Sequence, residues 1–178
     1  GLAETLGDGE RLADAHLLLF LSHSELGQID LAEREVGHVQ RLIEDLRQPA
    51  QLWLGMAPRV ELALLCGDFD TAEDLIGVDD RSRYRVAPAR DNVAATRFQR
   101  FVLRRSRGGL AQEEATVRAS VEEFPWYPLH RAALVCLLAE SGRRDEALTI
   151  FRGLAADAFR ALYRDNEWLV GMCLAADA

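Results

Sequence analysis

A short motif recurs three times along the chain and constrains its fold more than any other feature. Each copy has a glycine, an aspartate three residues later and an alanine five residues later, and the copies begin at Gly27, Gly67 and Gly142. Each copy follows one apolar stretch and opens the next. Glycine suits the left-handed backbone with which a helix ends. The motif therefore predicts helix–turn–helix hairpins.

The other motif residues also fit a hairpin. We expect the aspartates to cap the second helix of each pair by accepting from its free N–H groups; these are Asp30, Asp70 and Asp145. Glu33 and Glu73 follow three residues after an aspartate, which resembles a capping box. The alanine supplies a small side chain where two helices cross. A fourth, less regular hairpin is predicted at Gly108-Gly109, where no aspartate follows at the same offset.

The fold predicted from this pattern is all-α, with stacked antiparallel hairpins that form a right-handed α-solenoid. We expect one domain over residues 1–178, with four helix pairs and a terminal helix. The predicted pairs are 10–26 with 30–47, 50–66 with 70–77, 91–107 with 111–124, and 128–141 with 144–156, and a loop spans 78–90. Asp165 is expected to cap the terminal helix.

Composition removes several classes of function. All 21 basic residues are arginines, so neither a phosphate-binding loop of the Walker type nor a lysine Schiff base is present. The three cysteines lie far apart, which is typical of reduced thiols in a cytoplasmic protein. No signal peptide or membrane-spanning run is evident. The chain begins without methionine and ends within an apolar helical pattern, so we expect a fragment of a larger protein.

The spacing of the motif, with Phe151 nine residues after Gly142, resembles a tetratricopeptide (TPR) repeat. The stretch from Gly108 to Trp168 is similar to the helical repeats of large actinobacterial ATP-binding regulators, which carry LuxR-type DNA-binding or cyclase domains elsewhere in the chain. The resemblance covers the second half of the chain best. It implies a sensor or scaffold segment, similar in role to the repeats of MalT-like activators, without the ATPase or DNA-binding parts.

Positive charge is concentrated in one segment. Nine arginines and one acid, Asp91, lie between Arg81 and Arg107, whereas the whole chain carries a net charge of −8. Four of these arginines share one helical face and form what we call the arginine row: Arg97, Arg100, Arg104 and Arg107.

Guanidinium groups bind carboxylates and phosphates, so the arginine row is a candidate anion or partner site on the concave surface. The structural alternative pairs these arginines with neighbouring acids such as Glu73, Asp74, Glu113 and Glu114, and we favour it. An acidic peptide or an intramolecular partner is the next alternative, ahead of a nucleotide. Direct binding of nucleic acid is not expected from an acidic chain.

The histidines carry weaker signals. Glu35-Val36-Gly37-His38 matches the Glu-x-x-His pattern of di-iron bundles, but no second copy exists, so we interpret it as a chance match. His16 and His23 share a helical face, and packing is favoured over a metal pair. Ser22 and Ser24 flank His23 without an orienting acid. We therefore predict no catalytic residue, metal or cofactor.

Apolar residues near the C-terminal end complete the list of candidates. Trp53, Trp126 and Trp168 are expected to act as packing anchors between repeats. The set Trp168, Leu169 and Met172, with Cys173 and Leu174, would leave an exposed face at the end of a solenoid. We expect this face to contact another molecule or a further repeat. The predicted function is a non-catalytic protein-interaction, scaffold or sensor segment, with an anionic effector site as the alternative. A protein partner, a domain of the same chain and a second copy in a homodimer are the candidate partners.

Overall fold

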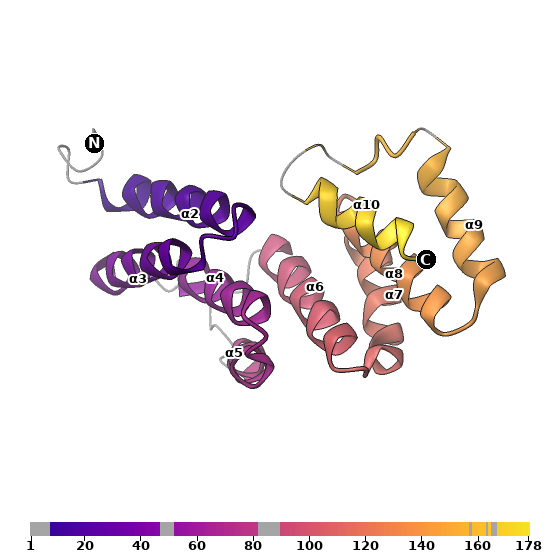
Figure 1. Cartoon of the computed structure of the whole chain (residues 1–178), viewed down its shortest axis with the longest axis horizontal. Helices are drawn as coiled ribbons and strands as arrows, with labels where there is room; N and C mark the ends of the chain where they lie inside the picture. The colour runs from indigo at the N-terminus through magenta and orange to yellow at the C-terminus, as the bar shows by residue number, and fades with distance from the viewer. Residues whose placement is uncertain (1–7, 47–51, 82–89, 157, 163, 165–166) are drawn as a thin grey trace. The chain divides into compact units, whose positions relative to one another are not determined.

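The computed structural model describes residues 8–46, 52–81, 90–156, 158–162, 164 and 167–178. Every regular element in these residues is helical, which confirms the all-α class (Figure 1). The chain divides into two compact units, Gly1–Val93 and Ala94–Ala178. The single continuous solenoid stays a prediction.

Within its described residues, the first unit contains four complete helices that form two consecutive pairs (Figure 1): α2 (Gly9–Glu25), α3 (Ile29–Leu46), α4 (Leu52–Leu65) and α5 (Phe69–Arg81). The bounds agree with the predicted helices to within about two residues, except at the end of α5. We predicted a loop from residue 78, but α5 continues to Arg81. The reason is that an isolated glycine such as Gly77 weakens a helix without ending it.

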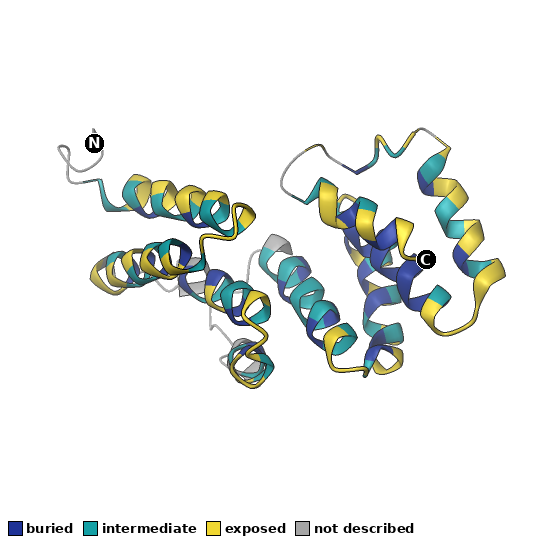
Figure 2. Cartoon of the chain, viewed as in Figure 1, coloured by how far each residue is buried: buried dark blue, intermediate teal, exposed yellow. Residues whose placement is uncertain are grey.

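The second unit surrounds one buried helix. Its described elements are α6 (Arg90–Ser106) from Ala94 onward, the 3₁₀ helix η2 (Leu110–Glu113), α7 (Glu114–Glu123), α8 (Leu129–Glu140), α9 (Arg144–Ala155) and α10 (Trp168–Ala176). Helix α8 packs against α7, α9 and α10. Nine of its residues are buried, from Leu129 to Leu138, so this helix is the core of the unit (Figure 2). Asp165, the predicted cap of α10, lies outside the described residues.

Four glycines end helices in the same way, as the sequence predicts. Gly27, Gly67, Gly108 and Gly142 have φ between 68° and 76°. After Gly142, the Arg143 N–H donates to the Leu138 carbonyl over 2.8 Å, and the Gly142 N–H donates to Ala139 over 3.0 Å. This pair of bonds is a Schellman motif, and equivalent bonds occur at the other three glycines.

The aspartate caps are placed wrongly by the sequence prediction. Helices α3, α5 and α9 begin two residues after the glycine, so Asp30, Asp70 and Asp145 are second residues of their helices, not caps. In the second copy the cap is Asp68, whose carboxylate accepts from the Thr71 N–H over 3.2 Å. The residue that closes the Schellman motif also starts the next helix, which shortens each turn. Glu33 and Glu73 consequently lie too far into their helices for capping boxes.

The motif alanines are buried where the helices meet. Ala32 and Ala72 are fully buried and Ala147 is 5% exposed. The irregular third hairpin differs, because Glu113 stands at the corresponding position and is also buried. The predicted helix from residue 111 starts instead as η2, and regular α-helix follows only from Glu114.

Helix α9 ends in a fifth Schellman motif that has no glycine. The Phe159 N–H donates to the Leu154 carbonyl and the Ala158 N–H to the Ala155 carbonyl. Ala158 and Phe159 both have positive φ, 57° and 59°. The left-handed region disfavours residues with a Cβ atom, so this helix end is strained relative to the other four.

Candidate interaction surfaces

Arg97, the first member of the arginine row, is engaged by α7. Its guanidinium lies 2.8 Å from a carboxylate oxygen of Glu123 and donates to the Ser120 hydroxyl over 3.3 Å. The same group lies 5.2 Å from the centre of the Phe124 ring, which is within cation–π range. These contacts attach α6 to the end of α7.

Arg104 lies 3.5 Å from the buried carboxylate of Glu113. The structure therefore pairs two members of the row with acids of their own hairpin, as the structural alternative expects. Arg100 and Arg107 also have interaction partners. Anion binding by the row stays a prediction, and it would have to displace these contacts.

Arg105 lies beside the row and was not singled out by the sequence. It reaches Glu140 on α8 over 2.8 Å and Asp177, just after α10, over 3.1 Å. The bond from Glu140 raises the pKa of Arg105 above its usual range, with a smaller contribution from Asp177. Arg105 thus joins α6, α8 and the end of α10. The sequence signal was weak, because the partners lie 35 and 72 residues away.

Two titratable side chains on α8 are held in their neutral forms. Burial, and to a smaller extent the nearby charge of Arg97, lower the pKa of His130 to about 4. The His130 ring packs among Phe98, Phe124 and Tyr127. Burial also raises the pKa of the Cys136 thiol to about 12. Both groups serve as core side chains at neutral pH.

The histidines of the first unit form a cluster that sequence reasoning missed. The Nδ1 atom of His16 lies 2.5 Å from a carboxylate oxygen of Glu35, and its ring stacks on His38 at 4.7 Å. Arg41 contacts Nδ1 of His38 over 3.0 Å. His16 is therefore paired across the α2–α3 hairpin, whereas His23 contacts Gln28. Within the described ranges, no group of His, Cys, Asp or Glu has the arrangement of a metal site.

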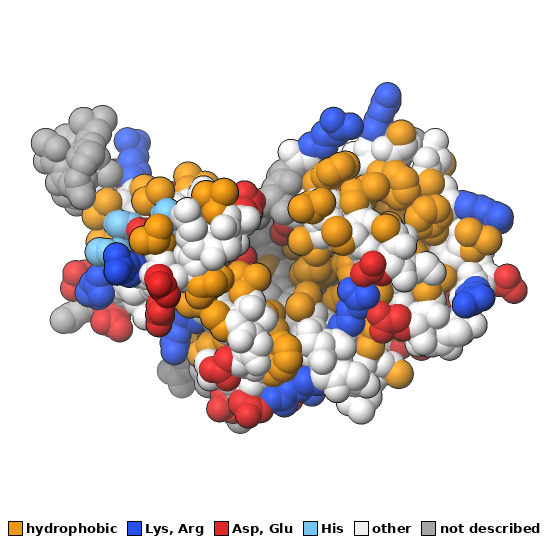
Figure 3. Space-filling view, in the orientation of Figure 1, with side chains coloured by type: hydrophobic (Ala, Val, Ile, Leu, Met, Phe, Trp, Pro, Cys, Tyr) orange, Lys and Arg blue, Asp and Glu red, His pale blue; other side chains and the backbone are white. Residues whose placement is uncertain are grey.

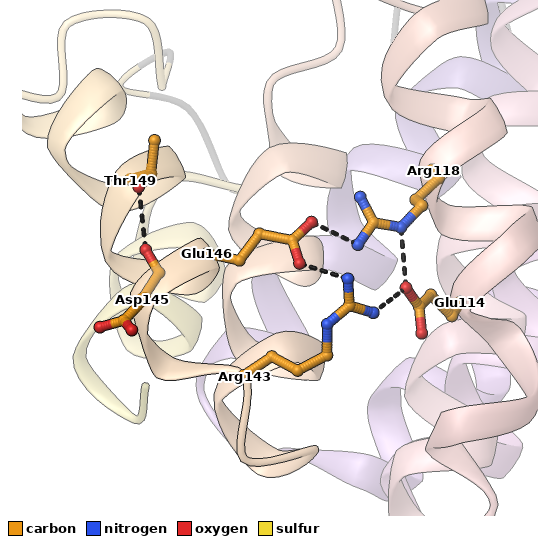
Figure 4. Close-up of polar contacts among 6 residues, drawn as sticks. All are labelled: Glu114, Arg118, Arg143, Asp145, Glu146 and Thr149. Carbon is orange, nitrogen blue, oxygen red and sulfur yellow. Dashed lines mark hydrogen bonds and ion pairs between the residues drawn. The ribbon is translucent and has the colours of Figure 1, made fainter.

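A four-membered ionic network joins α7 to the α8–α9 turn (Figure 4). Arg118 lies 2.8 Å from Glu114 and 2.6 Å from Glu146. Arg143 pairs with the same two carboxylates. Each guanidinium thus bridges two carboxylates, and the bonds from Arg118 lower the pKa of both Glu114 and Glu146. The network is partly exposed and links two hairpins of the second unit.

Helix α10 is apolar on every side, with no charged residue from Trp168 to Ala176. One face is buried, with Gly171 against Leu162 and Leu129. On the other side Leu169 is 64% and Val170 is 43% exposed. Figure 3 shows hydrophobic side chains gathered over this helix.

Two hollows flank α10. One, of about 290 Å³, is lined by Phe159, Leu162, Trp168 and Met172, with Arg160 and Arg164 at its edge. The other, of about 310 Å³, is lined by residues of α8 and α9 and by the end of α10. We call α10 and these two hollows the α10 surface. A helix that stands between two hollows offers the ridge and grooves against which other helices pack.

The tryptophans predicted as packing anchors differ in their surroundings. Trp126 is 40% exposed, with its ring centre 5.9 Å from those of Phe124 and Tyr127. Trp168 is half-buried and lies below Arg164, whose guanidinium is 5.8 Å from the ring centre. The side chain of Trp53 lies outside the described residues.

A groove of about 850 Å³ lies within the first unit, between α3 and the α4–α5 pair. Its apolar floor is formed by Val36, Leu62, Ala63 and Leu75, and its walls carry charged residues of α3, Arg59 and Asp68. The sequence gives no direct signal for this groove, because its residues come from three helices.

Comparison with protein families, curated proteins and solved structures gives no match. The resemblance to TPR-like repeats of regulators therefore stays a proposal. No described helix is both long enough and apolar enough to cross a membrane.

Proposed function

We propose that the chain is a non-catalytic protein-interaction module and that the α10 surface is its docking site. The observation that carries the proposal is the exposed apolar side of α10, centred on Leu169 and Val170. A helix that is apolar all round is normally covered on all sides. The neutral, buried states of His130 and Cys136 also suit a packing role better than proton transfer or nucleophilic attack.

The occupant we propose for the α10 surface is the same surface of a second copy of the chain. The chain carries a net charge of −8, but residues 94–178 hold 12 arginines and 11 acids, so the unit that carries the α10 surface is nearly neutral and does not repel a second copy of itself. Helix α10 itself is uncharged, so its exposed side can meet a second copy without repulsion between α10 helices. A two-fold dimer also buries the same apolar residues on both partners, and such dimers are the commonest oligomers.

The test is sedimentation equilibrium of the wild-type chain and of Leu169→Arg at concentrations of about 1–100 μM. We expect the wild type to dimerise and Leu169→Arg to remain monomeric, because the substitution places a charge in each half of the contact. A matched control is Leu18→Arg, since Leu18 is 65% exposed on α2 and carries the same side chain. A monomeric wild type, or equal loss of the dimer in both variants, would refute this docking site.

The finer features of the proposal follow the resemblance. The hairpins would stack as a TPR-like α-solenoid in a cytoplasmic signalling or transcriptional regulator, which is supported by the repeated Schellman turns and by the free thiols of Cys66, Cys136 and Cys173. The alternative of an anionic effector at the arginine row has less support, because Arg97 and Arg104 already pair with carboxylates.

A further inference from the structure

The groove in the first unit has a definite direction, because α3 and α4 run antiparallel. A Cβ atom added at Gly55, early in α4, would lie 3.2 Å from Ile43, late in α3. Further along α4, Leu62 packs against the cluster of Phe20, Ala32 and Val36, of which the last two lie early in α3. Arg59, which lies between Gly55 and Leu62, is therefore level with the middle to late part of α3.

Charge is segregated along this direction. The end of the groove near the start of α3 carries the acids Asp30, Glu33 and Asp68. The opposite end carries Arg41 and Arg59, both exposed. Asp30 and Arg41 are separated by roughly 16 Å along the helix at 1.5 Å per residue. The groove thus has an acidic end and a basic end, with the apolar floor between them.

The arginines of the basic half are available to a ligand. Within the part of the chain that the structure describes, neither Arg41 nor Arg59 forms an ion pair. Arg34 forms none with described residues either, but it lies beside Glu33 in the acidic half, where it is outnumbered by the three acids. Among the described residues, Arg41 makes one side-chain hydrogen bond, to His38. Its guanidinium lies 3.6 Å from where a Cβ atom of Gly37 would be, so the missing side chain leaves room for it over the wall of the groove. This contrasts with the arginine row, where carboxylates already engage Arg97 and Arg104.

We propose that this groove binds a short acidic segment of another protein. A pair of carboxylates at one end of the segment would meet Arg41 and Arg59, and aliphatic side chains would cover Leu62 and Leu75. The length of the groove accommodates about five residues of extended chain at 3.3 Å per residue. Its acidic end disfavours carboxylates there, which fixes the direction of the segment. This site is independent of the α10 surface.

Binding is tested on the full chain with labelled peptides of about five residues, a glutamate pair followed or preceded by three aliphatic residues. We expect one of the two peptides to bind and its glutamine counterpart to bind at least tenfold more weakly. The variant Arg41→Gln/Arg59→Gln should bind the glutamate peptide at least tenfold more weakly than the wild type does. The control Arg11→Gln/Arg152→Gln removes the same charge outside the groove and should bind like the wild type. Equal affinity of the two double variants would overturn the proposal, as would a wild type that binds neither peptide.

A charge-reversal variant distinguishes loss of the binding site from loss of folding. Arg41→Glu/Arg59→Glu should reject the glutamate peptide and accept one in which arginines replace the glutamates, which a merely unfolded variant would not do. Loss of binding without this exchange of preference would count against the site.

Direction is tested in a chain with intact arginines. Cys66 lines the acidic half of the groove, and in a Cys173→Ser chain it is the accessible thiol, since Cys136 is buried. A fluorophore on Cys66 should be quenched more strongly by a quencher at the aliphatic end of the peptide than by one at the glutamate end. The reverse order, or equal quenching, would overturn the proposed direction.

Discussion

Three substitutions around α9 test whether backbone conformation, and not side-chain contact, decides the helix ends. Gly142 has φ of 76°, and a Cβ atom there would meet nothing within 4 Å. Gly142→Ala therefore introduces no clash and only the cost of the left-handed region, roughly 1–2 kcal/mol. The reduced entropy of the unfolded chain returns about 0.4–1 kcal/mol. We expect a net loss of about 1 kcal/mol in the free energy of unfolding, a decrease in Tm of roughly 4–8 °C for a unit of this size.

Substitution of Ala158 is expected to change the free energy of unfolding in the opposite direction. Ala158 occupies the same position of its Schellman motif as Gly142, with φ of 57°. Ala158→Gly relieves the strain and should stabilise the second unit by up to about 1 kcal/mol. Gly153 lies within α9 and has open space around it, so Gly153→Ala should also stabilise, by about 1 kcal/mol. Urea unfolding followed by circular dichroism gives all three values. If Gly142→Ala and Gly153→Ala change stability in the same direction, the reasoning from φ is wrong.

Two further predictions concern pH and charge. Because the folded-state pKa of His130 is lowered from 6.5 to about 4, the unfolded chain takes up this proton first, so stability is lost as pH falls from 6.5 towards 4. This loss amounts to about 3 kcal/mol. His130→Phe should abolish it, which is checked by measuring the urea midpoints of both proteins between pH 6.5 and 4. If the two midpoints fall in parallel, the assignment to His130 is wrong. Glu146→Gln removes two ion pairs of the network in Figure 4 and should lower Tm in dilute buffer. The decrease should shrink in high salt, and a salt-independent difference would show that the network acts through packing instead.

The ends of the helices were predictable from the sequence because few residues other than glycine adopt the positive φ of a Schellman motif. Gly27, Gly67 and Gly142 each end a helix where the motif placed the end. The fourth, Gly108, ends α6 in the same way although its motif is incomplete. The caps were misplaced because the sequence alone does not show that one residue closes a Schellman motif and starts the next helix. The hydrogen bonds of Gln28, Asp68 and Arg143 reveal this in the three copies.

The candidate surfaces were less predictable because their partners are distant in sequence. The arginine row is visible as a helical face, but its pairing with Glu113 and Glu123 depends on how α6 packs on the next hairpin. Prediction of the groove in the first unit would have required knowing how α3 and α4 are aligned along each other. The spacing from Asp30 to Arg41 places both residues on one face of α3. It does not show which helix packs against that face.

Because α8 is buried, hydrogen exchange at its amides reports the stability of the second unit. Amide hydrogens in a helix covered by α7, α9 and α10 can exchange with solvent only when that whole unit opens. Deuterium uptake between Leu129 and Leu138 therefore measures the opening of this unit alone, inside the intact chain. Uptake at the buried residues of α3 provides the matching measure for the first unit.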